Sequence, residues 1–216
     1  MRPLGKVKIK WSPEFAYALG LLATDGNLSS DGRHFDFTSK DRQQLLNFMR
    51  CLDIKVKIGY KTSGYTGQKT SRIQFGDKKL YEFLLKIGFT PAKTKTIAEL
   101  AIPDEYFFDF LRGHFDGDGT FYSYWDTRWK SSFMFYTVFI SASKIHIDWL
   151  RNKIFKFLKI KGHITKDGKK IVYQLKYAKK ESLELLRKMY YSSEVICLTR
   201  KRLKVEKALV IIGMKL

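Results

Sequence analysis

Two segments of the chain are alike, LGLLATDG at residues 19–26 and LRGHFDGDG at residues 111–119. Each ends an apolar run, carries an interior glycine and closes on Asp-Gly. The offset from Asp25 to Asp118 is 118 − 25 = 93 positions, nearly half of the 216 residues. Because a residue without a side chain lets another backbone approach closely, we expect the two apolar helices to pack on each other. Their ends would then bring Asp25 and Asp118 side by side.

The elements around these segments also occur twice. Ser12 and Pro13 are a typical helix start, and Pro103 starts the corresponding helix in the second half. Each half is predicted to follow the order helix, two strands, helix, two strands, helix, which is an α+β fold. We expect an N-terminal half-domain at residues 1–88, a linker at 89–102 and a C-terminal half-domain at 103–216.

Hydrophobic periodicity places the elements within each half. In the first half we expect a helix up to Thr24, a strand around Phe35 and Phe37, and then a helix, two strands and a helix at residues 45–52, 54–61, 71–75 and 78–87. In the second half we expect a helix from 103 and a strand region at 120–142 with an extended hairpin at 122–132. A helix at 147–158, strands at 160–165 and 171–177, and a helix at 179–190 are expected to follow. The tail at 191–216 is expected to add one helix.

The composition indicates a folded, basic protein. Hydrophobic residues make up 44% of the chain, and 41 Lys and Arg against 21 Asp and Glu give a net charge of +20. Such a charge points to nucleic acid first and to an anionic membrane second. The membrane is disfavoured because the apolar runs are far shorter than the ~20 residues that span a bilayer. With no signal peptide visible, we expect a cytoplasmic or organellar protein.

Cysteine and histidine give no sign of a metal site of their own. Cys51 and Cys197 lack metal-ligand spacing and are expected to be buried thiols. The four histidines are scattered, which argues against a zinc site and against a histidine-based nuclease.

Asp25 and Asp118 have a chemical interpretation and a structural one. Two neighbouring carboxylates repel, which raises one pKa unless a cation lies between them. Mg²⁺ suits such oxygen ligands and binds through one or two carboxylates plus substrate phosphates, so a basic protein with this pair is a candidate phosphodiesterase. Asp-Gly after a helix is also a common cap and turn. Two instances at matching places of a repeat favour the functional interpretation.

These two segments resemble the motifs of the LAGLIDADG homing endonucleases, in the single-chain form with two motifs. The second segment is the closer match, whereas Ala23 stands where the first motif often has an earlier acid. The resemblance implies two αββαββα half-domains, a central interface of motif helices, and antiparallel sheets that form a saddle over DNA. It maps the metal-binding acids onto Asp25 and Asp118 and adds the backbone carbonyls of Thr24 and Gly117.

The resemblance also suggests supporting residues. Lys78 and Lys179 correspond to a basic residue near the scissile phosphates, with solvated charges at helix starts as the alternative, and Lys79 or Lys180 could take their place. Ser39 and Ser143 correspond to polar residues that organise water. Helix capping explains these two serines equally well.

Strand residues on the side away from the core are expected to contact DNA, and we expect this side of both sheets to be basic. Arg and Gln suit base edges, whereas Lys more often contacts phosphate. For any single residue, an ordinary solvated surface is a serious alternative. The candidates are Arg33, His34, Asp36, Thr38, Lys61, Lys69, Arg72 and Gln74 in the first half, and Arg128, Lys130, Lys166, Lys169, Lys170, Gln174 and Lys176 in the second.

The resemblance therefore implies an intron-encoded monomer that cuts both strands of a long, asymmetric duplex and leaves short 3′ overhangs. Mg²⁺ is the expected cofactor, with Mn²⁺ as a substitute, and Ca²⁺ is expected to bind without supporting cleavage. Two alternatives use the same fold: an RNA maturase, whose partner would be intron RNA, and a DNA-binding regulator without catalysis. Intact acids in both motifs argue against a purely binding role.

Overall fold

The first helix begins at the predicted cap. In the computed structural model, which describes residues 5–62, 67–168 and 172–216, the Ser12 hydroxyl accepts the Phe15 N–H at 3.1 Å. Pro13 follows in the first turn, where its missing N–H costs nothing. Helix α1 (Pro13–Asp25) is buried from Phe15 to Ala23, as its apolar run predicts.

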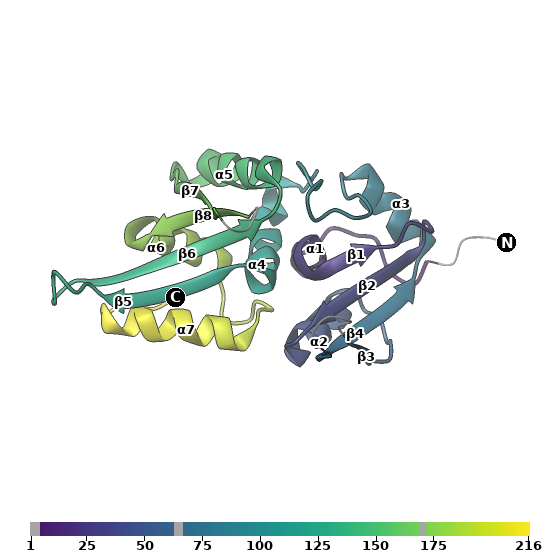
Figure 1. Ribbon diagram of the computed structural model, residues 1–216, viewed down its shortest axis with the longest axis horizontal. Helices are drawn as coiled ribbons and strands as arrows, with labels where there is room; N and C mark the ends of the chain where they lie inside the picture. The colour runs from purple at the N-terminus through teal and green to yellow at the C-terminus, as the bar shows by residue number, and fades with distance from the viewer. Residues whose placement is uncertain (1–4, 63–66, 169–171) are drawn as a thin grey trace.

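The first half has the expected order of elements (Figure 1). After α1 come β1 (Gly26–Leu28), β2 (His34–Ser39), α2 (Arg42–Cys51), β3 (Gly59–Thr62), β4 (Lys69–Gly76) and α3 (Lys78–Lys86). The strands form an antiparallel sheet in the order β1-β2-β4-β3. The strand predicted at residues 54–61 is wrong in its first part, because β3 begins only at Gly59.

The second half repeats this order. A short 3₁₀ turn (Asp104–Tyr106) leads into α4 (Phe107–Gly117), and β5 (Thr120–Trp125), β6 (Phe133–Ser141), α5 (Lys144–Leu158), β7 (His163–Lys166), β8 (Tyr173–Ala178) and α6 (Lys179–Met189) follow. The sheet order β5-β6-β8-β7 matches the first half. The predicted extended hairpin is confirmed by β5 and β6, and the expected tail helix by α7 (Thr199–Ile211).

One backbone detail shows how closely the halves correspond. Asp53 follows α2 with φ 50°, and Lys159 follows α5 with φ 58°. Few residues other than glycine adopt this left-handed conformation, so the same unusual helix end occurs twice. Both lie in the short local match that the sequence shows between residues 52–55 and 158–161.

Helices α1 and α4 pack side by side between the two sheets (Figure 1). A Cβ atom on Gly20 would lie 2.1 Å from the carbonyl oxygen of Phe110, and one on Gly113 would lie 2.0 Å from that of Tyr17. The contact is reciprocal, since 113 − 20 and 110 − 17 both equal 93. The repeat in sequence is therefore a pseudo-twofold axis in space.

The stretch between α3 and the turn at Asp104 contains no helix or strand, and several of its apolar residues are buried. Among the described residues, no helix combines the length and apolar character that crossing a membrane requires.

Gly113→Ala tests the helix contact. The added methyl group meets backbone rather than a movable side chain, so we expect the free energy of unfolding to fall by about 1–3 kcal/mol, as overpacking does elsewhere. Denaturant unfolding followed by circular dichroism measures it. Gly168→Ala is the matched control, because a Cβ there has no atom within 4 Å. Equal unfolding energies for the two variants would contradict the close contact.

Candidate active site at the end of the motif helices

The carboxyl ends of α1 and α4 meet. A Cβ atom on Gly117 would lie 1.9 Å from the Thr24 hydroxyl oxygen and 3.0 Å from Oδ2 of Asp25. The carboxylate of Asp25 therefore lies beside the residue that precedes Asp118. Two acids that are 93 positions apart in sequence belong to one site, which neither half builds alone.

Asp25 is held in place from the first sheet and α2. Gln44 Nε2 donates to Oδ2 of Asp25 at 2.6 Å, and the Ser39 hydroxyl donates to Gln44 Oε1 at 2.6 Å. Asp25 lines an open cavity of about 630 Å³ together with both of these residues and Gly117. The cationic residues that line the same cavity are Lys40, Arg42 and Arg200.

Two buried lysines reach the site, Lys93 from the stretch that follows α3 and Lys201 from α7. Lys93 Nζ donates to the Thr24 carbonyl at 3.2 Å, and Lys201 Nζ donates to the Gly117 carbonyl at 3.1 Å. Lys201 also donates to the carbonyls of Phe115 and Gly119, both at 2.6 Å. An ammonium group has three donors, so the contacts of Lys201 are complete. The two lysines contact the same pair of carbonyls that the family resemblance suggests as metal ligands.

The charges of the site compensate one another in part. Burial, and then the charge of Asp118, raises the pKa of Asp25 to about 6, against the lowering influence of Gln44 and the two lysines. Burial lowers the pKa of Lys93 and of Lys201 to about 8, although neighbouring carboxylates oppose this. Asp118 itself is exposed. The site therefore holds two acids and two ammonium groups close together at neutral pH.

The donor set fits a divalent metal such as Mg²⁺. Two carboxylates that destabilise each other gain from a cation between them, and oxygen ligands suit Mg²⁺. Within the described residues, no cluster of three or more His, Cys, Asp or Glu is placed to hold a metal. A metal here would therefore need water or substrate phosphate to complete its ligands, as Mg²⁺ sites commonly do.

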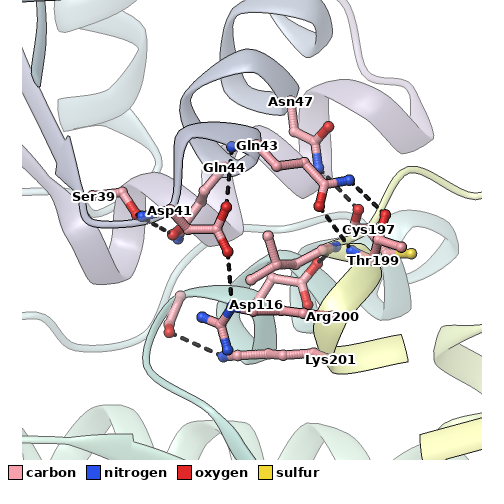
Figure 2. A network of polar contacts seen from close by, with 12 residues as sticks. Ser39, Asp41, Gln43, Gln44, Asn47, Asp116, Cys197, Thr199, Arg200 and Lys201 are labelled. Atoms are coloured by element: carbon pink, nitrogen blue, oxygen red, sulfur yellow. Dashed lines mark hydrogen bonds and ion pairs between the residues drawn. The ribbon is translucent and has the colours of Figure 1, made fainter. Parts of the chain in front are cut away.

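The start of α7 joins the second half to α2 of the first half beside this site (Figure 2). Gln43 and Thr199 exchange two hydrogen bonds, of 2.6 and 3.1 Å, and Arg200 Nε donates to Asp41 at 2.8 Å. Asn47 adds a bond of 3.0 Å to the Cys197 carbonyl. These contacts fix the helix turn that carries Lys201.

Asp116 supports the same segment. Its Oδ2 accepts the Tyr17 hydroxyl at 2.8 Å and the Leu198 N–H at 2.6 Å, and the residue is fully buried. Burial raises the pKa of Asp116 to about 6. It thus ties the motif helices to the residues just before Lys201, whereas Ala23 in the corresponding place of α1 makes no such contact.

Lys78 and Lys179 are not near the acids, contrary to the sequence expectation. Gly26 pairs with Phe37, whereas Gly76, just before α3, pairs with His34. Lys78 therefore starts at the opposite end of the sheet, roughly 10 Å or more away at about 3.3 Å per residue. Its exposed ammonium lies 3.8 Å from Glu82.

Lys179 is displaced in the same way. Its Nζ donates to the Phe133 carbonyl at 3.0 Å, whereas the strand that follows Asp118 begins opposite Val138. Five residues of strand separate these positions, roughly 15 Å. The expectation failed because the two Lys-Lys pairs, at 78–79 and 179–180, occupy corresponding helix starts. Both of these helix starts lie away from the two acids.

The two serines have different surroundings. Ser39 lines the cavity and reaches Asp25 through Gln44. Ser143 instead caps α5, since its hydroxyl oxygen accepts the His146 N–H at 3.3 Å while its hydroxyl donates to the Ile97 carbonyl at 2.5 Å. For Ser143 the structure supports the capping alternative.

The uncovered face of the first sheet is polar but carries an acid beside its arginine, rather than the basic surface that was expected. Asp36 pairs with Gln74, and Thr38 with Arg72, while Phe35 and Phe37 turn to the core. Arg72 binds Asp36 through two hydrogen bonds, of 2.8 and 2.5 Å. Other predicted residues on or next to this sheet are Arg33, Lys61 and Lys69, which are exposed, and His34, which hydrogen-bonds Asp31.

The second sheet departs from the prediction of a basic face. Gln174 and Lys176 lie on its uncovered face, opposite Ile140 and Val138. Lys166 pairs with Tyr173 and so lies on the other face, with its ammonium 5.8 Å from the Tyr173 ring centroid. Arg128 and Lys130 are exposed between β5 and β6. Lys169 and Lys170 lie outside the described residues.

Sequence reasoning missed Lys93, Lys201 and Gln44. Each lysine follows the last repeated helix of one half, but at a different distance along the chain, so the two positions do not align in the repeat. Lys93 comes seven positions after Lys86, the end of α3, and Lys201 comes twelve after Met189, the end of α6. A lysine in a basic chain gives no signal by itself, so only the fold reveals the pair.

Comparisons with known proteins identify the fold. A scan against protein-family models finds no match, and neither does a search of curated proteins. Among solved structures, the I-LtrWI LAGLIDADG homing endonuclease bound to target DNA has a TM-score of 0.60 at 11% identity, covering 93% of this chain and 90% of that chain. I-DmoI in complex with DNA and Mn has a TM-score of 0.54 at 18% identity, covering 83% and 97%.

Full-length DUF199/WhiA from Thermatoga maritima is also similar, with a TM-score of 0.57 at 17% identity over 95% of this chain and 70% of that chain. The protein therefore has the LAGLIDADG homing endonuclease fold, which confirms the fold expected from the two motifs. At these identities the likeness establishes the fold alone.

The raised pKa of Asp25 predicts how stability changes with pH. A carboxyl whose pKa is about 6 in the folded state and 3.8 in the unfolded state destabilises the fold when ionised. This loss in the free energy of unfolding is absent below about pH 4, increases up to about pH 6 and reaches its full value above that pH. In EDTA, Asp25→Asn should raise the free energy of unfolding at pH 8 by about 1–3 kcal/mol and leave it unchanged at pH 4.

Asp118→Asn is the comparison for this measurement. It should raise the free energy of unfolding at pH 8 by less than Asp25→Asn does, because water screens an exposed charge. If Asp25→Asn destabilised the protein equally at both pH values, the charge of Asp25 would not be the destabilising factor.

Proposed function

We propose that the protein is a site-specific endonuclease that cuts both strands of a long, asymmetric DNA duplex. One observation carries the proposal: acids from two halves meet at a pseudo-twofold axis, together with buried Lys93 and Lys201. The net charge of +20 suits a polyanion. The solved structures of I-LtrWI and I-DmoI with DNA support duplex DNA as the partner.

Asp25 and Asp118 would hold Mg²⁺, with Mn²⁺ as a substitute, and I-DmoI with Mn supports a divalent ion. When bound, the metal would activate water and stabilise the charge of the leaving oxygen. Gln44 fixes the carboxylate of Asp25 through its 2.6 Å bond. Lys93 and Lys201 supply positive charge where negative charge increases on the phosphate.

The cations around the cavity would bind the DNA backbone. Lys40 and Arg42 are exposed at the start of α2, and Arg200 lines the same cavity on the side of α7. Bound phosphates would thus be fixed on either side of Asp25 before cleavage. We extend the proposal to a monomer that leaves short 3′ overhangs, that binds Ca²⁺ without cutting, and that is encoded within an intron.

A second candidate is a DNA-binding protein without nuclease activity. This candidate is favoured by one observation, which is that Lys93 and Lys201 already occupy the carbonyls of Thr24 and Gly117. The two candidates differ in one result, which is whether bound DNA is cut when Mg²⁺ is added.

Asp25→Asn and Asp118→Asn test the acids. Each variant should lower the cleavage rate by at least about 100-fold, the typical loss when one group that stabilises the transition state is removed. Target duplexes come from selection of cleaved molecules in a randomised library, with Mg²⁺ and with EDTA. DNA affinity in Ca²⁺ should be retained within severalfold. Wild-type cutting by either variant would refute the assignment.

Lys93→Met and Lys78→Met form a matched pair that separates the two lysine assignments. Both remove one positive charge and keep the length of the side chain. Lys93→Met should slow cleavage by about 100-fold, and Lys78→Met should leave it unchanged because its ammonium faces Glu82 in solvent. Single-turnover assays on protein with a normal circular dichroism spectrum measure both. The reverse order would restore the role that the sequence suggests for Lys78.

A further inference from the structure

Three tyrosines share the uncovered face of the second sheet. Tyr122 pairs with Tyr136 across β5 and β6, and Tyr124 lies two positions along the same strand. The alternating residues Phe121 and Phe135 are buried on the other face, where α5 and α6 pack. The tyrosines therefore face away from the core, and we call them the tyrosine ladder.

The rings of the ladder stack on one another. The centroids of Tyr122 and Tyr136 are 5.2 Å apart with an interplanar angle of 17°, and those of Tyr124 and Tyr136 are 6.3 Å apart at 7°. Strand side chains stand roughly perpendicular to their sheet, so stacked rings present their edges and hydroxyl groups outward. Because ring faces are in contact with each other, stacking on unpaired bases is not the use that this arrangement favours.

The surroundings of the ladder carry little charge. Thr120, Val138 and Ile140 continue the same face, and Lys176 contributes its positive charge from β8. A hydrogen bond with Tyr124 raises the pKa of Tyr136, so the Tyr136 hydroxyl remains neutral near pH 7 and can both donate and accept a hydrogen bond. The first sheet has the bound pair of Asp36 and Arg72 on its corresponding face instead. The two halves thus offer different chemistry to a ligand.

We propose that the tyrosine ladder recognises a thymine-rich half-site in duplex DNA. Ring edges would contact the 5-methyl groups of thymine in the major groove, where apolar contact identifies this base, and the hydroxyl groups would bond to base edges. The inference rests on the proposed binding of duplex DNA. It gains support from charge, because Lys176 borders the ladder and exposed Arg128 and Lys130 follow the end of β5, where a phosphate backbone would pass.

The first experiment identifies the half-site. Duplexes bound in Ca²⁺ are selected from a randomised library with the wild type, with Tyr124→Ala and with Gln74→Ala. Tyr124 is 43% exposed, so its truncation is tolerated by the fold, and a thermal melt verifies this. Tyr124→Ala should relax the sequence preference in one half of the site only. Gln74→Ala, on the first sheet, is the matched control and should relax the other half.

The second experiment tests the methyl groups. Deoxyuridine replaces thymidine in one half of the selected duplex at a time, which removes only the 5-methyl group. In the half that Tyr124→Ala relaxes, each contacted position should weaken wild-type binding about fourfold, as the loss of one buried methyl group predicts. Tyr124→Ala should be less sensitive to the replacement there, because the contact is already lost.

Three results would overturn the inference: a half-site without enriched thymine, uracil replacement without effect, or tighter binding to single strands than to duplex. Failure of the proposed duplex binding looks different, since no duplex sequence would then be enriched by any form of the protein, whereas a protein that binds duplex DNA without cutting it would still enrich a sequence in Ca²⁺.

Discussion

The whole arrangement depends on the contact between α1 and α4. Their backbones approach so closely at Gly20 and Gly113 that any side chain at either position would meet a carbonyl oxygen. This contact fixes the pseudo-twofold axis and hence the relation of the two sheets. It also brings Asp25 beside Gly117, so the candidate site exists only when both helices are packed. The packing of α1 on α4 therefore fixes the geometry of the candidate site as well as the relation of the two halves.

Electrostatics explains why the site tolerates two acids. Ionised carboxylates at the end of a buried helix pair destabilise the fold, and the raised pKa of Asp25 expresses this cost. Lys93 and Lys201 offset part of it from positions on the two carbonyls that precede the acids. Under the proposed function, the carbonyls of Thr24 and Gly117 would be open to a metal only where Lys93 and Lys201 release them. The C-terminal segment matters for this reason, since its contacts with α2 and Asp116 hold Lys201 in place.

The sequence predicts the features that repeat and misses those that do not. Apolar runs, a capping serine and paired glycines specify α1, α4 and their contact, and the alternation around Phe35 predicts a sheet with one buried face. The lysines of the site follow segments of unequal length, so no periodic pattern identifies Lys93 or Lys201. Lys166 was assigned to the wrong face because strand register, which decides the face, depends on its pairing with Tyr173.

The second sheet shows the same limit. Its uncovered face was expected to be basic from the overall charge, yet β5 and β6 place tyrosines there. Net charge describes the molecule as a whole and not a particular face. The two halves have therefore kept one backbone plan while their uncovered surfaces differ, which is consistent with an asymmetric ligand.

Under the proposed function, Asp25 and Asp118 would form one metal site across the two halves. Anomalous scattering from crystals of the protein with DNA and Mn²⁺ tests it most directly. An anomalous peak is expected within bonding distance of oxygens of both carboxylates, at the roughly 2.0–2.2 Å typical of such small divalent ions, with Lys93 or Lys201 displaced from its carbonyl. Bound DNA without a peak between the acids, and with both lysines unmoved, would contradict it.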